Sequence, residues 1–94
     1  MAVVEREATI VNPLGMHARP AAEFVKVAAR FRAAVEVRKD ELKVNGKSIM
    51  GVMMLAAEKG SSIFIRTDGD DAEPAMDALC QLVAAGFNEM DLTE

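Results

Sequence analysis

Pro20 precedes a run of apolar residues with helical spacing, and these two features together locate the start of one helix. The run places Ala21, Phe24, Val25, Ala28 and Phe31 in a single stripe. Proline has no amide N–H and is tolerated only in the first turn of a helix. We therefore predict a helix over about Ala18–Phe31 that begins beside His17.

Four short segments with alternating apolar residues predict strands, because successive side chains of a strand point to opposite faces. The segments are Val3–Val11, Ala34–Arg38, Leu42–Asn45 and the residues around Ile63 and Ile65. Arg6 interrupts the apolar face of the first segment. The polar turn Lys39-Asp40-Glu41 joins the second and third segments into a hairpin.

Capping signals predict two further helices. Ser48 is a candidate N-cap for a short helix over Ile49–Ala57 that ends near Gly60. The last helix, over about Ala72–Ala85, starts with Pro74 in its first turn and with the capping-box pair Asp70 and Glu73. Its buried face holds Met76, Leu79 and Val83, with Leu82 at the margin, and Gly86 ends it.

The order strand–helix–strand–strand–helix–strand–helix predicts a two-layer α+β fold. Each helix has one apolar stripe, so the helices should cover one face of an antiparallel sheet. A chain of 94 residues is long enough for one such domain, which we expect to span residues 1–94.

Charge is distributed unevenly along the chain. All 11 Lys and Arg residues lie within residues 1–66, whereas residues 67–94 carry only acidic charges. A net charge of −4 without Trp or Tyr argues against a nucleic-acid partner, while the basic part suits an acidic protein partner. One Cys and one His exclude an internal disulfide and a four-ligand Cys/His zinc site. We expect neither a metal nor a cofactor.

Hydropathy and the first residues of the chain predict the cellular location. The longest uncharged stretch, Ala78–Asn88, is much shorter than the ~20 apolar residues that cross a bilayer. Glu5 and Glu7 come too early for a secretory signal peptide. We therefore predict a cytoplasmic protein that does not insert into membranes.

His17 and Arg19 are the first candidate functional residues. The free amide N–H groups and the dipole of a helix N-terminus bind anions, and the guanidinium of arginine matches phosphate oxygens. Imidazole is a nitrogen nucleophile. These residue types together suit a phosphoryl group carried on His17. A lone histidine at a helix start more often has no chemistry; the setting Gly15–Arg19 favours the functional interpretation, but the spacing alone leaves both open.

Ser48 and the residues after it form a second candidate region. Ser48 is compatible with a plain N-cap and with a phosphorylation site, because Lys47 and the helix N-terminus would both stabilise a phosphate there. The next residues include Ile49, Met50, Val52, Met53, Met54 and Leu55. One short helix cannot bury all six, so we predict that about half pack in the core and the rest form an exposed, Met-rich binding patch.

Around these sites the sequence resembles a known family, the histidine-containing phosphocarriers HPr of the phosphoenolpyruvate-dependent phosphotransferase system. Asn12–Ala21, NPLGMHARPA, is similar to the phosphohistidine motif of the family. Asn45–Leu55, NGKSIMGVMML, is similar to its regulatory serine motif. The strand at Gly60–Thr67 and the acidic last helix follow in register, so the resemblance covers essentially the whole chain.

The resemblance implies an open-faced β-sandwich, in which four antiparallel strands carry three helices on one face. It implies a carrier without enzymatic turnover: His17 would accept a phosphoryl group from enzyme I through Nδ1 and pass it to enzyme IIA domains, with Arg19 supporting the phosphate. Ser48 would match the serine that HPr kinase/phosphorylase modifies in cells containing that kinase. The partner contacts would fall on Met16, Lys47, Ile49, Met50 and Met53.

Two branches of the family remain open. NPLGMHARP and the ending Ala84–Asp91, AAGFNEMD, resemble the nitrogen-related carrier NPr. The intact segment Lys47–Gly51 resembles instead the sugar-transport carriers that the serine kinase controls. A third hypothesis is a regulatory binding module whose signal is phosphorylation of Ser48. The sequence favours a monomer.

Overall fold

The computed structural model describes residues 2–89. Its elements, in chain order, are β1 (Ala2–Thr9), α1 (Ala18–Ala28), β2 (Ala34–Lys39), β3 (Leu42–Asn45), α2 (Ile49–Met54), β4 (Ser62–Gly69), α3 (Ala72–Ala84) and the 3-10 turn η1 (Gly86–Asn88). This succession confirms the predicted order of strands and helices. Within the described residues, no helix has the length and apolar character needed to cross a membrane.

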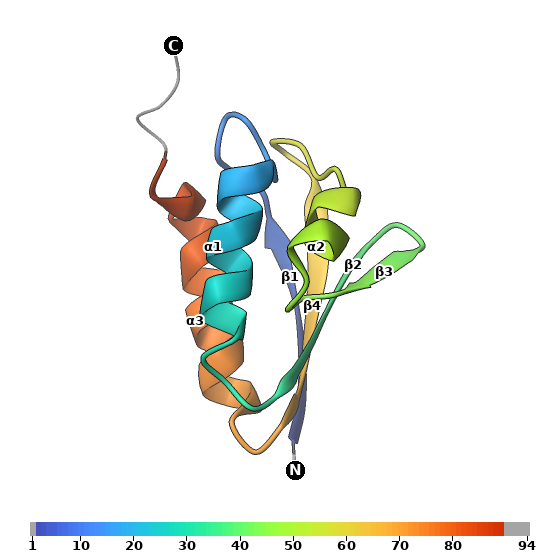
Figure 1. Ribbon diagram of the computed structural model, residues 1–94, viewed down its shortest axis with the longest axis vertical. Helices are drawn as coiled ribbons and strands as arrows, with labels where there is room; N and C mark the ends of the chain where they lie inside the picture. Colours follow the sequence, from blue (N-terminus) through green and yellow to red (C-terminus); the bar gives the residue numbers. More distant parts are fainter. Residues whose placement is uncertain (1, 90–94) are drawn as a thin grey trace.

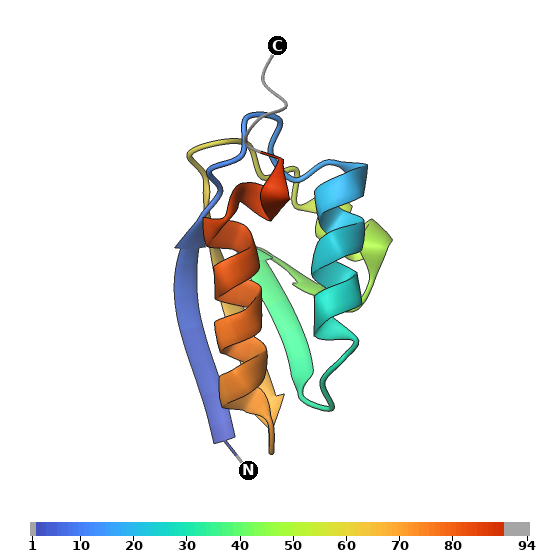
Figure 2. The ribbon, with the colours of Figure 1, turned by 90° about the vertical axis from the view of Figure 1, so that its left-hand side faces the viewer.

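The four strands form one antiparallel sheet in the order β1-β4-β2-β3. Helices α1 and α3 lie side by side over one face of this sheet (Figure 2). Helix α2 packs beside α1, close to β3, and no helix from the described residues covers the opposite face (Figure 1). The predicted two-layer α+β architecture is therefore confirmed.

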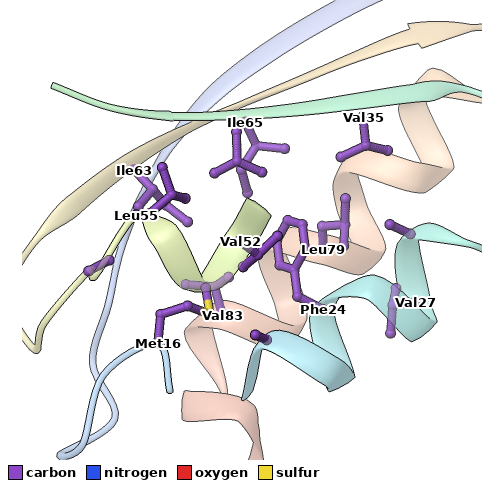
Figure 3. Close-up of a cluster of buried hydrophobic side chains, with 14 of the residues drawn as sticks. Met16, Phe24, Val27, Val35, Val52, Leu55, Ile63, Ile65, Leu79 and Val83 are labelled. Atoms are coloured by element: carbon purple, nitrogen blue, oxygen red, sulfur yellow. The ribbon is translucent and has the colours of Figure 1, made fainter. Parts of the chain in front are cut away.

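The apolar faces of the helices and the sheet meet in one core (Figure 3). It includes Met76, Leu79 and Val83, as predicted, and also Ile63 and Ile65 of β4. On α1, Ala21, Phe24 and Ala28 are buried as predicted, whereas Val27 is buried in place of the predicted Val25, which is only partly buried. Pro20 is also buried, in the first turn of this helix.

Two helices are shorter than the apolar patterns predict. Helix α1 ends at Ala28 rather than Phe31, because the amides of Arg32 and Ala33 donate to the Asp71 carboxylate (2.9 and 2.8 Å) instead of continuing the helix. Helix α2 ends at Met54 rather than Ala57, since Ala56 has a left-handed backbone with φ 49°. Long-range contacts and backbone geometry, rather than apolar spacing, set both ends.

The predicted capping box at the start of α3 is wrong. The N-cap is Asp71 rather than Asp70, and its side chain makes no hydrogen bond to its own helix. The carboxylate accepts the two amides that precede β2 instead, and the amide of Arg32 is the main cause that lowers the pKa of Asp71. Asp71 therefore joins the start of α3 to the entry of β2.

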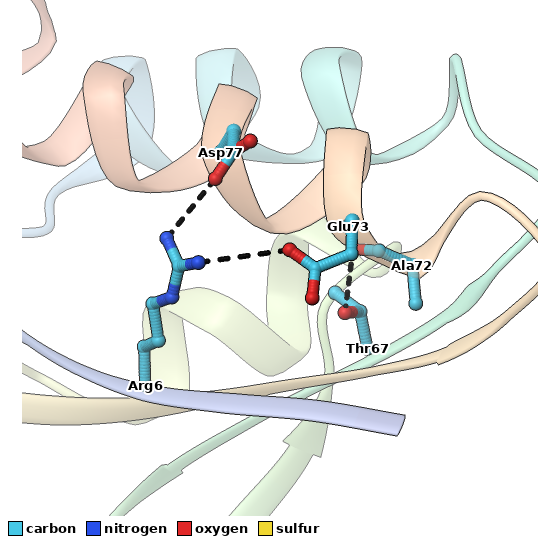
Figure 4. Close-up of polar contacts among 5 residues, drawn as sticks. All are labelled: Arg6, Thr67, Ala72, Glu73 and Asp77. Atoms are coloured by element: carbon cyan, nitrogen blue, oxygen red, sulfur yellow. Dashed lines mark hydrogen bonds and ion pairs between the residues drawn. The ribbon is translucent and has the colours of Figure 1, made fainter. Parts of the chain in front are cut away.

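The interruption of the apolar face of β1 by Arg6 has a structural reason. The Arg6 guanidinium reaches over α3, 3.0 Å from an Asp77 carboxylate oxygen and 3.7 Å from one of Glu73 (Figure 4). The hydrogen bond to Asp77 is the main cause that raises the pKa of Arg6. Beneath this surface contact, the Thr67 hydroxyl donates to the carbonyl of Ala72 at 2.9 Å, which fixes α3 on the sheet.

Candidate functional site

The loop between β1 and α1 is held in one conformation by backbone contacts. Gly15 N–H donates to the Asn12 carbonyl, and Met16 N–H donates to the Ala57 carbonyl at 2.7 Å. Gly15 has φ +71°, and a Cβ at this position would lie 2.6 Å from the Ala57 oxygen. Glycine is therefore required here by both backbone angle and space. The loop is consequently fixed against the chain that leaves α2.

His17 is the N-cap of α1, which confirms the predicted helix start. Its carbonyl accepts the first helical hydrogen bond, from Ala21 at 2.9 Å. The amides of Ala18 and Arg19 make no hydrogen bond to the described residues, and Pro20 has no amide N–H. Since the first N–H groups of a helix point outward along its axis, these two amides are available to an anion beside His17.

The imidazole of His17 contacts the buried carboxylate of Glu89. His17 Nε2 lies 2.9 Å from Glu89 Oε1, and the Asn12 side-chain amide donates to the same oxygen at 2.9 Å. The His17 side chain is 39% exposed, whereas that of Glu89 is 1% exposed. The imidazole is therefore partly open to solvent, while Nε2 contacts a buried carboxylate.

Glu89 reaches this position because the chain reverses after α3. Gly86, Phe87 and Asn88 all have left-handed backbone angles (φ 65°, 56° and 61°). The Phe87 side chain is buried in the main core, which anchors the reversal. The segment after the last helix is thereby directed beneath His17.

Asn12 and Glu89 are the site residues that sequence reasoning missed. In the sequence, Asn12 stands out only as the first residue of the segment that resembles the phosphohistidine motif, and Glu89 only as part of an ending that resembles NPr. The contact between His17 and Glu89 joins residues 72 positions apart, so no local pattern indicates it. The available signal was Gly86-Phe87 after the last helix, which indicates a reversal with an apolar anchor.

Arg19 lies on the first turn of α1 and is exposed. Its guanidinium forms no ion pair or hydrogen bond with residues 2–89, and so it is free to meet an anion at the helix N-terminus. Among the sequence-predicted site residues, the structure brings Arg19 and His17 together on one turn.

Ser48 is the N-cap of α2, as predicted, and its hydroxyl accepts from the Gly51 amide at 3.1 Å. No hydrogen bond within the described part of the chain joins Ser48 to His17. The neighbouring Lys47 is held elsewhere: its ammonium donates to the Phe31 carbonyl at 2.8 Å. The two predicted regions are thus connected through α2 and the loop at Ala57, rather than by direct side-chain contact.

Helix α2 exposes the predicted Met-rich patch, which we define as Ile49, Met50, Met53 and Met54. Met50 is the most exposed of them, at 75%, whereas Val52 and Leu55 are buried in the core. Met16, predicted as a partner contact, is only 5% exposed and packs in the core, so its side chain offers little surface to a partner. The patch accordingly belongs to α2 alone.

Comparison with known proteins agrees with this architecture. A family model described as "PTS HPr component phosphorylation site" matches residues 4–85. The chain is 46% identical to phosphocarrier protein HPr of Cupriavidus necator over 93% of its own length and 98% of the relative. It is 53% identical to HPr of Pseudomonas putida, with coverage of 89% and 94%.

Solved structures show the same fold. An HPr structure from Thermoanaerobacter tengcongensis has a TM-score of 0.88 at 44% identity, and the match covers 92% of this chain and 97% of the other. A structure described as an HPr dimer from the same organism has a TM-score of 0.72 at 46% identity, with coverage of 76% and 82%.

A four-stranded antiparallel sheet with three helices, together with the matched phosphorylation-site model, defines a phosphocarrier domain of the phosphotransferase system. The chain belongs to the HPr family.

Proposed function

We propose that the protein relays a phosphoryl group through His17, from phosphorylated enzyme I to enzyme IIA domains. The observation that carries this proposal is the placement of a half-exposed imidazole at the N-cap of α1, inside the segment that the family model matches. Since Nε2 is engaged by Glu89, Nδ1 is the ring nitrogen left for the phosphoryl group.

The relay needs two displacements at phosphorus. The lone pair of Nδ1 forms a bond to the phosphorus of the donor, and the bond between phosphorus and the donor breaks. An acceptor nucleophile then takes the phosphoryl group and the electron pair returns to Nδ1. The free amides of Ala18 and Arg19 and the Arg19 guanidinium stabilise the phosphate oxygens. The protein returns to its starting state only when both partners act, so it is a carrier without turnover of its own.

The Met-rich patch is the proposed docking surface for both partners. Exposed Met side chains adapt to differently shaped surfaces, which suits a carrier that binds a donor and several acceptors in turn. The patch adjoins the site because the chain leaving α2 pairs with the His17 loop at Ala57. We expect the carrier to act as a monomer in the cytoplasm. The relatives described above are named HPr, which favours general enzyme I over a nitrogen-specific donor.

We further propose that Ser48 is a control point where HPr kinase/phosphorylase is present. A phosphate there would carry a charge of about −1.5 to −2 directly before the Met-rich patch. The positive end of the α2 dipole would stabilise this phosphate. The phosphate would nevertheless repel an acidic partner surface. Phosphorylation of Ser48 would then lower the rate of phosphoryl acceptance at His17 without unfolding the protein.

An intact-mass measurement tests the carrier function. The protein is incubated with phosphoenolpyruvate, magnesium and an active enzyme I, and then treated briefly with acid. We expect a single phosphoryl adduct that acid removes, and no adduct in the folded variant His17→Ala. An adduct that persists in His17→Ala, or a folded native protein that acquires none, would contradict the proposal.

A further inference from the structure

We propose that Glu89 is a positioning residue for His17: its buried carboxylate selects which ring nitrogen carries the proton and balances the ring charge while Nδ1 holds a phosphoryl group. This inference rests on the proposed carrier function and deepens it.

The hydrogen bonds around Glu89 show which groups donate and which accept. The Asn12 side-chain amide donates to the Gly15 carbonyl at 2.8 Å, which fixes the orientation of that amide. Its nitrogen also lies 2.9 Å from Glu89 Oε1, so this oxygen acts as an acceptor. His17 Nε2, at 2.9 Å from the same oxygen, is then the second donor. A proton on Nε2 leaves the lone pair of the neutral ring on Nδ1, the nucleophilic atom.

The same contact has a second effect during transfer. When Nδ1 forms its bond to phosphorus, Nε2 keeps its proton and the ring becomes a cation. Glu89 meets that cation through a charge-assisted hydrogen bond inside the protein, where little water weakens it. When the bond between Nδ1 and phosphorus breaks again, the ring returns to neutrality. The carboxylate therefore stabilises the phosphorylated ring more than the free ring.

Two features indicate that Glu89 is placed for this contact and not for local stability. Glu89 Oε2 and Asn12 Oδ1 are buried without a hydrogen-bond partner among residues 2–89, an unfavourable arrangement that native proteins rarely keep without a reason. The reversal that delivers Glu89 holds Phe87 in a left-handed backbone conformation, which is strained for a bulky residue.

Nitrogen NMR of the imidazole tests the proposal directly, because His17 is the only histidine in the chain. The ring shifts of the unphosphorylated protein should report a proton on Nε2 in the native protein. In Glu89→Gln, whose side-chain amide has both a donor and an acceptor, the ring should shift toward a mixture of tautomers. Glu73→Gln removes an exposed carboxylate on α3 and should leave the ring shifts unchanged.

Transfer kinetics supply the second measurement. By analogy with other carboxylates that orient histidines, Glu89→Gln should slow phosphoryl acceptance by about tenfold or more. Glu89→Asp, which shortens the side chain but keeps the charge, should recover part of that loss. If Glu89→Gln is folded and matches Glu73→Gln in both ring shifts and rate, the proposal is overturned.

The two measurements also separate this inference from the carrier function. The NMR comparison needs no enzyme I, so a tautomer change in Glu89→Gln would support the positioning role even if His17 accepted no phosphoryl group. Conversely, a normal adduct combined with unchanged ring shifts and rate in Glu89→Gln would leave the carrier function standing and refute the role of Glu89. Since Gln has nearly the shape of Glu, the variant also avoids the cavity that alanine would leave.

Discussion

The ammonium group of Lys47 donates a hydrogen bond to the Phe31 carbonyl at 2.8 Å, which joins the residue before Ser48 to the chain that leaves α1. Lys47 was predicted to contact partners, yet in the free protein its charge is directed inward, toward the segment between α1 and β2. The region around Ser48 and α2 is therefore joined to the segments on both sides of α1, at Phe31 and, through Ala57, at the loop that carries Met16.

Lys47→Met should lower the free energy of unfolding by about 1 kcal/mol, because the Phe31 carbonyl loses its donor while the length of the side chain is kept. Urea denaturation of both proteins measures the difference. Lys43→Met, in which an exposed lysine of β3 is replaced, serves as control and should change stability little. Equal stabilities of the two variants would show that the Lys47 contact contributes nothing.

Asp71→Asn should destabilise the protein at neutral pH but not in acid. The pKa of Asp71 is lowered in the fold, so its contribution is complete above the unfolded-state value of about 4 and disappears as the pH falls through the lower folded-state value. Urea titrations of both proteins at about pH 7 and pH 3 check this, since the stability difference should shrink at the lower pH. Asp70→Asn, at the exposed neighbouring position, is the control. A difference that is the same at both pH values would refute the assignment.

Gly15→Ala should be more damaging than Gly60→Ala, although both glycines have positive φ. The added Cβ at Gly15 meets the Ala57 oxygen at 2.6 Å, whereas at Gly60 it meets nothing within 4 Å. Gly60→Ala should therefore cost about 1 kcal/mol from backbone strain alone, and Gly15→Ala at least about 2 kcal/mol. Because Gly15 supports His17, only Gly15→Ala should also slow phosphoryl acceptance. Thermal unfolding and the intact-mass assay together measure the two effects; equal losses would mean that the loop adjusts freely.

Met50→Ser should weaken the binding of enzyme I by about tenfold, or ~1.4 kcal/mol, while it leaves stability within ~0.5 kcal/mol. The reason is that Met50, at 75% exposure, is the most exposed residue of the proposed docking surface. Calorimetric titration with enzyme I measures the affinity. Leu42→Ser replaces an exposed apolar residue of β3 away from the patch and should bind normally. A Met50→Ser variant with native affinity would exclude the patch from the interface.

Ser48→Ala and Ser48→Asp should separate the capping role of the serine from its proposed regulatory role. Alanine removes the bond to Gly51 and should cost about 1 kcal/mol, whereas Asp is itself a good N-cap and should keep stability. Only Ser48→Asp adds charge beside the Met-rich patch, so only it should weaken enzyme I binding. Repeating the titration in the His17→Ala background shows whether Ser48 acts as a signal independently of the carrier function. Identical affinities for both Ser48 variants would argue against electrostatic control.

Local patterns predicted the elements that local physics determines. Strand β3 over Leu42–Asn45, the N-cap Ser48 and the start of α1 at His17 each depend on neighbours within a few residues, and all three are confirmed. The predictions are wrong where a side chain forms a hydrogen bond with a distant segment instead of with its own helix. Asp71 leaves its own helix uncapped because it binds Arg32 and Ala33, residues 39 and 38 positions away.

The candidate site likewise has features that the local sequence predicts and features that depend on distant segments. The helix start and its two free amides follow from Pro20 and could be predicted. The Glu89 contact could not, because it depends on a chain reversal after α3 and on the packing of Phe87 in the core. The exposed Met-rich patch of α2 was predicted from the sequence. The burial of Met16 was not, because it depends on how the loop before α1 packs against the core.

The separation of His17 from Glu89 has a consequence for folding. Three of the four strands and all three α-helices of the described fold lie between these two residues. Closing that long loop costs entropy that only the intervening contacts can offset, so the pair should form late. A partly folded or truncated chain would then display an unsupported imidazole. The ability to carry a phosphoryl group would thereby report that the whole chain has reached its native state, which would keep incomplete molecules out of the relay.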